Sequence, residues 1–190
     1  MVSMPVKILV HTQTVVRGLL REVNKLASTM EKAEERLFNT ILDTTAHAPQ
    51  GDTVLLQSLF EEKQSLITTL EGLYAAKFML ESLDSLLESL ERPERIPVVL
   101  TASLKVLENA GQALKRSHEA ESLYIRIVRA ELEGLMASNG LLLSEPSPEA
   151  DSIVETITRG ALQQARTLAM KRAPPSPILG TLVRAGESLA

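Results

Sequence analysis

Residues 53–91 read TVLLQSLFEEKQSLITTLEGLYAAKFMLESLDSLLESLE, and this stretch decides the fold. Leucine recurs in it at every seventh position, at Leu59, Leu66, Leu73, Leu80 and Leu87. A sustained heptad repeat is typical of a helix that packs along a partner helix through a continuous seam. We therefore predict one long helix over residues 53–91, with these five leucines as the seam of a hairpin.

The partner helix is predicted over residues 14–46, which carry apolar side chains at helical spacing. A matching heptad row runs through Val16, Val23, Met30 and Leu37. Pro49 and Gly51 interrupt the pattern between the two helices, and so short a connection forces them to pack antiparallel. The predicted fold class is all-α: a long antiparallel helical hairpin, with shorter helices packed on it and a flexible C-terminal tail helix.

Prolines divide the rest of the chain. Pro93 and Pro97 end the second helix, because neither fits a helix interior. Helices are predicted over 98–115 and 117–137, or alternatively one kinked helix over both ranges. We assign residues 14–140 to a helical core. We assign 141–190 to a linker, a detached regulatory helix over 148–172 and a proline-rich tail.

The first residues, 1–13, form an apolar segment that is too short for a signal peptide. We interpret it as an N-terminal arm, either a packed strand-like extension or a short segment that inserts into a membrane or docks on a partner. No run of 18 apolar residues occurs, so we expect no membrane-spanning helix. The 190 residues include no cysteine, which fits a reducing, cytoplasmic environment.

Catalytic and metal-binding patterns are not found in the sequence. His11, His47 and His118 share no ligand spacing, and the glycines are scattered singly rather than gathered in a phosphate-binding loop. Aromatic residues make up only 3% of the chain, which gives little material for lining a substrate pocket. We therefore expect no metal, no cofactor and no enzymatic activity.

Basic residues gather on one side of the first predicted helix. At 100° per residue, five of them fall within a sector of about 100° opposite the apolar side. They are Arg17, Arg21, Lys25, Lys32 and Arg36. Residues 52–91, by contrast, carry eight acidic and two basic side chains. The basic sector is either a solvated helix face or a binding surface for an anionic membrane.

The order of these features resembles the ESCRT-III family, most closely its archaeal cell-division branch (CdvB-like). The matching segments are LREVNKL at 20–26, EERLF at 34–38, Gly51 with Asp52 at the turn, the Leu-Glu steps at 80–81 and 90–91, and the pattern of 96–107. The resemblance covers about residues 14–140. Residues 55–60 depart from it, because they lack the Tyr-Ala-x-Glu type of signature expected there.

The resemblance implies a subunit that polymerises, with itself or with paralogues, into filaments that remodel and sever membranes in cell division. It implies a cytoplasmic, peripheral membrane location at the division site, with the basic sector on anionic lipid. It also implies a tail that recruits an AAA ATPase through an MIT domain. The tail candidates are Arg172, Pro174, Pro175, Pro177, Ile178 and Leu179.

A closed state is a further expectation, in which helix 148–172 folds back on the acidic second helix. Arg159 and Arg166 would then pair with Glu81, Asp84 and Glu88. The alternative function is a soluble helical-bundle adaptor, PhoU-like, that binds only protein partners. Nucleic-acid binding ranks third, because the formal net charge is −4 and no aromatic residues interleave with the basic ones.

Overall fold

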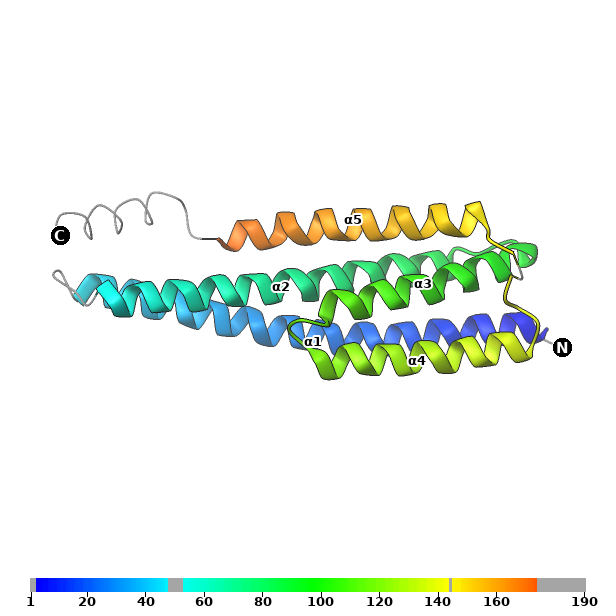
Figure 1. The fold of residues 1–190 in the computed structure, drawn as a ribbon, viewed down its shortest axis with the longest axis horizontal. Coiled ribbons are helices and arrows are strands. Elements are labelled where there is room, and N and C mark those ends of the chain that lie inside the picture. The colour runs from blue at the N-terminus through cyan, green and yellow to red at the C-terminus, as the bar shows by residue number, and fades with distance from the viewer. Residues whose placement is uncertain (1–2, 48–52, 144, 174–190) are drawn as a thin grey trace.

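The computed structural model describes residues 3–47, 53–143 and 145–173, and these ranges contain helices and short connections but no strand. The elements are α1 (Met4–His47), α2 (Thr53–Glu88), the 3₁₀ turn η1 (Pro93–Arg95), α3 (Ile96–Leu114), α4 (Glu119–Ser138) and α5 (Pro148–Arg172). Helices α1 and α2 form an antiparallel hairpin that runs the length of the molecule (Figure 1). The predicted all-α fold with a long helical hairpin is confirmed.

The predicted N-terminal arm is not separate from the hairpin, because α1 already begins at Met4. Pro5 lies in the first turn, where a missing backbone N–H costs nothing. Thr12 is fully buried, and its hydroxyl donates to the carbonyl of Ile8 at 2.8 Å. Residues 4–13 thus extend the hairpin at its open end, and the division at residue 13 is wrong.

The buried side of α1 has a regular spacing of four, four and three residues. It comprises Ile8, Thr12, Val16, Leu19, Val23, Ala27, Glu34 and Ile41, with Met30 and Phe38 half-buried between them. An eleven-residue period of this kind stays close to the natural 3.6 residues per turn. The same side of α1 therefore faces the bundle from one end of the helix to the other.

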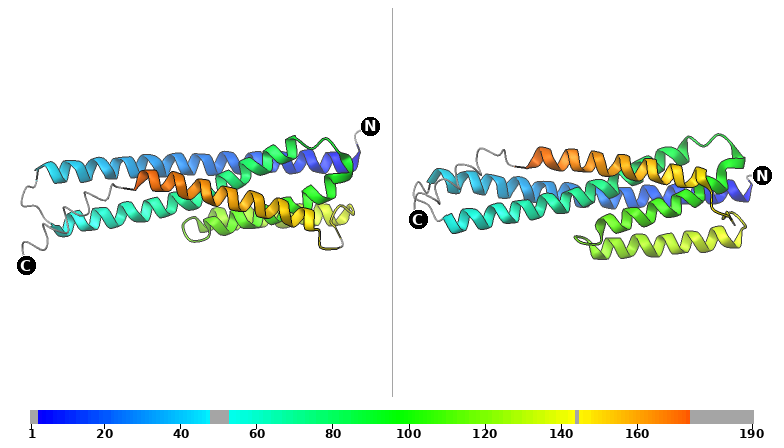
Figure 2. Two further views of the ribbon diagram at one scale, coloured as in Figure 1. Left: turned by 90° about the horizontal axis from the view of Figure 1, so that it is seen from above. Right: turned by 45° about the horizontal axis from the view of Figure 1, so that its top comes forward.

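The predicted leucine seam of α2 is buried in only one half of the helix. Leu73, Leu80 and Leu87 are fully buried, whereas Leu59 and Leu66 are half-buried. The reason is visible in Figure 2, where α3 and α5 also pack against the C-terminal half of α2. Among the described residues near the tip, the two arms of the hairpin pack only on each other.

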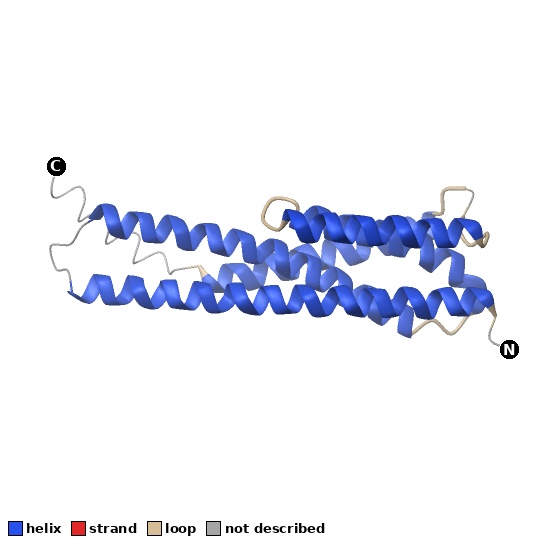
Figure 3. Ribbon diagram, turned by 90° about the horizontal axis from the view of Figure 1, so that it is seen from below, coloured by secondary structure: helices blue, strands red, loops and turns tan. Residues whose placement is uncertain are grey.

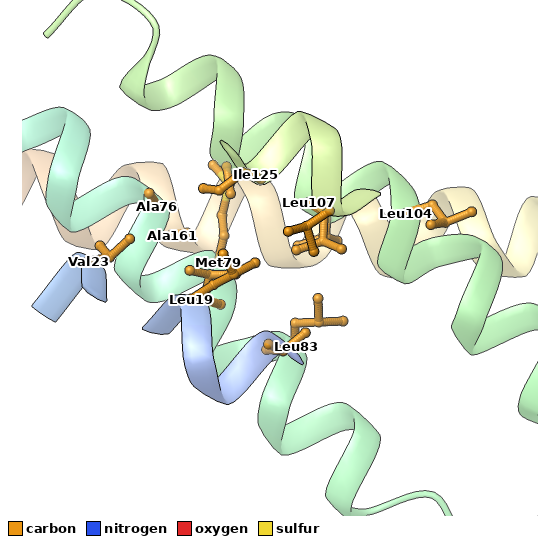
Figure 4. Close-up of a cluster of buried hydrophobic side chains, with 14 of the residues drawn as sticks. Leu19, Val23, Ala76, Met79, Leu83, Leu104, Leu107, Ile125 and Ala161 are labelled. Carbon is orange, nitrogen blue, oxygen red and sulfur yellow. The ribbon is translucent and has the colours of Figure 1, made fainter. Parts of the chain in front are cut away.

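Helices α3 and α4 are two separate helices joined by a tight turn, which excludes the single kinked helix. The Ser122 hydroxyl closes the pair by donating to the carbonyl of Gly111 at 2.7 Å. Helix α4 ends at Ser138, and Gly140 just beyond it has a left-handed φ of 65°, which is typical of a glycine that follows a helix. Side chains from α1, α2, α3, α4 and α5 meet in one core, where Met79 lies near Leu19 and Leu107 (Figure 4).

Helix α5 has the predicted boundaries but is not detached. It lies along α2 over most of its length (Figure 1). Its buried residues are small, namely Ala150, Ala161, Ala165 and Ala169. Small side chains let the two helix axes approach closely, and half-buried Val154, Ile157 and Leu168 pack around the contact. The element predicted as a flexible tail helix is thus a packed layer of the bundle.

Candidate functional site: the basic face of α1 and the charge cluster beneath α5

The outer side of α1 carries a line of exposed cations. Arg21, Lys25, Lys32 and Arg36 are all exposed, as the helical spacing predicts. Among the residues that the structure describes, none of these four has an acidic group within 4.0 Å. Their charge is therefore available to an external anion. We refer to these four residues as the basic face.

Arg17, the fifth predicted member, is bound within the hairpin. Its Nε donates to Asp84 of α2 at 2.8 Å, and its Nη2 lies 3.5 Å from Glu88. This pairing bridges the two arms and neutralises the guanidinium. The structure thus separates Arg17 from the basic face and gives it a structural contact.

Lys7 belongs to the basic side of α1 but is absent from the predicted set. It is exposed, and at 100° per residue it lies in the same angular sector as Lys25. It was missed because residues 1–13 were assigned to an arm outside the helix. A predicted helix that began near Met4, with Pro5 in its first turn, would have placed Lys7 in this sector.

A pair of opposite charges is buried between the arms of the hairpin. Lys63 of α2 donates to Glu34 of α1 at 2.5 Å, and the two side chains are only 3% and 5% exposed. The ammonium group also lies 4.0 Å from the centre of the Phe38 ring. Burying two charges is favourable only when each is fully paired, so this contact constrains how the arms pack.

Arg172, the last residue of α5, completes this cluster from outside. Its Nη1 donates to the second carboxylate oxygen of Glu34 at 2.9 Å, and its Nη2 lies 3.5 Å from Glu31. Glu31 also accepts a hydrogen bond of 2.6 Å from the Tyr74 hydroxyl. We call these residues, Glu31, Glu34, Lys63, Tyr74 and Arg172, the charge cluster.

Two members of the charge cluster, Tyr74 and Arg172, have raised pKa values. Burial raises the pKa of the Tyr74 phenol, and the hydrogen bond to Glu31 raises it further. Burial alone would lower the pKa of Arg172, but its hydrogen bond to Glu34 and the neighbouring negative charge raise it overall. The raised pKa of Tyr74 keeps its phenol neutral, so that it donates to Glu31. The raised pKa of Arg172 keeps its guanidinium charged beside Glu31 and Glu34.

Helix α5 packs against α2, as the predicted closed state requires, but the predicted residues do not make the contact. Arg159 pairs with Glu155 on its own helix, and Arg166 has no acidic partner among the described residues. Asp84 and Glu88 are instead bound by Arg17, and Glu81 lies 3.8 Å from Lys77. Among the described residues, the ion pairs from α5 to the hairpin are made by Arg172, which was predicted to belong to the partner-binding tail.

The opposite end of α5 is also held by charged groups. Arg95 donates to Glu149 at 2.5 Å, and Lys105 of α3 pairs with Asp151. Between these contacts and the charge cluster, Asn109 donates to the Thr158 hydroxyl at 3.0 Å. Helix α5 is therefore held by polar contacts at both ends and by alanines along its middle.

The remaining predicted tail residues, Pro174, Pro175, Pro177, Ile178 and Leu179, lie outside the described residues. In the described ranges no three His, Asp or Glu side chains gather as a metal site would require. None of the helices within those ranges combines the length and the apolarity needed to cross a membrane. A groove between α1 and α4 is lined by His11, Val15, Glu22, Tyr124 and Glu131, among others.

The chain was compared with protein families, curated proteins and solved structures. No family model, no curated protein and no solved structure matches the chain.

Proposed function

We propose that this protein is an ESCRT-III-like subunit that polymerises on anionic membranes and remodels or severs them, in cell division of the archaeal type. The observation that carries the proposal is the basic face, four exposed cations along the outer side of a long hairpin that have no acidic partner among the described residues. The cytoplasmic surface of the membrane at the division site is the proposed location. Self-assembly and recruitment of an AAA ATPase by the tail belong to the same proposal.

The magnitude of the attraction is sufficient for peripheral binding. Each basic residue close to an anionic surface contributes about 1 kcal/mol, so the four residues of the basic face contribute about 4 kcal/mol. The attraction decays over a Debye length of about 8 Å at physiological ionic strength, so binding should weaken as salt is added. A single subunit binds weakly, and a polymer multiplies the contact.

The position of α5 supports a closed subunit awaiting assembly. Helix α5 covers the side of α2 that faces away from α1, with a seam of alanines suited to a close helix contact. Release of α5 would leave this side of α2 free for another subunit. Arg172 directly precedes the tail, so a partner pulling on the tail would draw it away from Glu34.

The test is co-sedimentation of the full chain with vesicles of anionic or neutral lipid at two salt concentrations. We expect the protein to pellet with anionic vesicles at low salt, and the double variant Lys25→Glu/Lys32→Glu to stay in the supernatant. The matched control is Lys115→Glu/Arg116→Glu, which makes the same change of charge at two exposed residues after α3. Negative-stain microscopy of the pellet should show filaments.

Two results would overturn the proposal. One is a chain that stays in solution with anionic vesicles at low salt. The other is equal loss of binding in both double variants, which would show a response to net charge rather than to the basic face. A soluble protein that binds neither lipid nor itself would favour the PhoU-like adaptor instead.

A further inference from the structure

Helix α4 is apolar on two sides. One side is buried against α3 and α1 through Ser122, Ile125, Val128, Leu132 and Met136. The other side carries a second row, composed of Ala120, Leu123, Ile127, Ala130, Gly134 and Ala137. All six residues of this second row are exposed, and the side chains of Leu123 and Ile127 are 53% and 48% exposed. We call these six residues the outer row.

The spacing of the outer row alternates strictly between three and four residues, which is the pattern of the a and d positions in a coiled coil. A helix surface that faces only solvent has no physical reason to carry apolar residues at this regular spacing. Helix α4 lies at the edge of the bundle, beside α3 and the N-terminal half of α1 (Figure 2), and the view in Figure 3 shows it on the near side. No other part of the described chain covers the outer row.

We propose that the outer row is a docking seam for α4 of a second copy of this chain, in an antiparallel arrangement about a two-fold axis. The spacing of the row is symmetric about the point between Val128 and Arg129, whereas the sizes of its side chains are not. Reversing it places Leu123 opposite Gly134, Ile127 opposite Ala130, and Ala120 opposite Ala137 of the second copy. Each large side chain then meets a small one, which is how packed layers fill space.

The space needed for this packing is present. A Cβ placed at Gly134 would have no heavy atom within 4 Å apart from the backbone of its own helix, so Leu123 of a second copy can approach the backbone there. A parallel arrangement is less suitable, because it would set Leu123 against Leu123 and Gly134 against Gly134. Size complementarity therefore selects the antiparallel orientation.

Charges flanking the row fit the same arrangement. In an antiparallel pair, Arg126 on one flank lies next to Glu133 of the second copy, and the two-fold axis repeats this contact. Arg126 is exposed and has no acidic partner among the described residues, while Glu133 is held by Arg129 of its own chain at 3.0 Å. On the other flank, Tyr124 lies next to Glu131 of the second copy.

The seam is one helix of 20 residues, about 30 Å long, so the interface is smaller than that of a standard stable complex. We therefore expect a weak, concentration-dependent dimer. The pairing requires no lipid and is tested in solution. Its failure would leave the proposed membrane binding unaffected, and the reverse also holds.

The first experiment measures the mass of the full chain by sedimentation velocity over a range of concentrations without lipid. A dimer should form as concentration rises, and Ile127→Glu should abolish it. Leu162→Glu is the matched control, because Leu162 is 49% exposed on α5, outside the outer row. Circular dichroism verifies that each variant is folded. A chain that is monomeric at every concentration, or a dimer indifferent to Ile127→Glu, would overturn the proposal.

The second experiment uses charge reversal and tests the orientation. Arg126→Glu and Glu133→Arg should each weaken the dimer by about tenfold or more, because like charges then meet twice across the axis. Mixing the two single variants should restore dimerisation, since every contact in the mixed dimer joins opposite charges. Restoration by Glu131→Arg in place of Glu133→Arg would indicate parallel helices and would refute the two-fold antiparallel arrangement.

Discussion

Arg172 and Glu34 lie 138 positions apart in the chain, yet the guanidinium of the first donates a hydrogen bond of 2.9 Å to the carboxylate of the second. This contact joins the end of α5 to the middle of α1. It also joins an outer layer of the bundle to a charge pair buried within the hairpin, because the other oxygen of Glu34 accepts from Lys63.

Replacing Arg172 should loosen the end of α5. Hydrogen bonds to charged groups contribute about 1.5–3 kcal/mol, so Arg172→Ala should speed amide exchange in the last two turns of α5 by about tenfold or more. Hydrogen–deuterium exchange with peptide-level mass spectrometry measures this. Arg166→Ala on the same helix is the control, since Arg166 is exposed and unpaired in the described structure. Equal protection in both variants would show that Arg172 does not hold α5.

Removing one member of the buried pair should be far more costly than removing both. Glu34→Ala leaves Lys63 charged and unpaired at 3% exposure, which should lower the free energy of unfolding by about 3–5 kcal/mol. Glu34→Leu combined with Lys63→Met should recover most of that loss, because no buried charge is then left without a partner. Urea denaturation gives both values. Glu35→Ala, with a side chain 66% exposed, should have little effect.

Gly72 of α2 should tolerate no side chain. A Cβ placed there would lie 2.7 Å from the carbonyl oxygen of Ala113 in α3, and a backbone atom cannot rotate away. We expect Gly72→Ala to lower the free energy of unfolding by about 1–3 kcal/mol. Gly18→Ala is the opposite case, since nothing lies within 4 Å of its Cβ position, and alanine should stabilise α1 by about 0.5–1 kcal/mol. A similar effect of the two substitutions would refute the close α2–α3 contact.

Tyr74 should make the stability sensitive to alkaline pH. Burial and the hydrogen bond to Glu31 raise the pKa of its phenol in the folded protein above the ordinary value of 10.0. The unfolded chain therefore releases this proton at lower pH than the folded protein does. The stabilisation is complete below pH 10 and declines as the pH rises above that value.

The test compares unfolding free energies from pH 8 to pH 11. The wild-type protein should lose stability above pH 10 more steeply than Tyr74→Phe, which has no proton to release at this position. Tyr124→Phe, at an exposed tyrosine of α4, should keep the wild-type slope. Parallel curves for the wild type and Tyr74→Phe would contradict the raised pKa.

The periodic pattern of the sequence was enough to predict the hairpin and the extent of α5. The heptad leucines located α2, and Ser147 followed by Pro148 is a typical helix start, confirmed by the bond of 3.2 Å from the Ala150 amide to the Ser147 hydroxyl. The N-terminal turns of α1 were missed because Thr12 interrupts the apolar pattern. A threonine can be buried there because its hydroxyl bonds within the same helix.

The charge cluster was beyond prediction for a different reason. Glu34 and Lys63 each occupy a position in an apolar row, Lys63 between Leu56 and Leu70, and that is the one sign in the sequence that they are buried. Their pairing depends on how far the two arms are offset, which the helical period does not specify. The packing of α5 on α2 was likewise predicted, but with the wrong contact residues. An apolar stripe shows that one side of a helix is covered, but it does not show which side chains meet there.

The buried pair also determines how the hairpin can respond to load. Sliding α2 by seven residues along α1 would bring Leu56 or Leu70 to Glu34 and would leave the buried Lys63 ammonium without its carboxylate, a change that costs several kcal/mol. The two arms therefore resist sliding along one another, and the proposed release of α5 would leave this buried pair in place. We therefore expect a force applied at the open end of the hairpin to be transmitted along both arms to the tip.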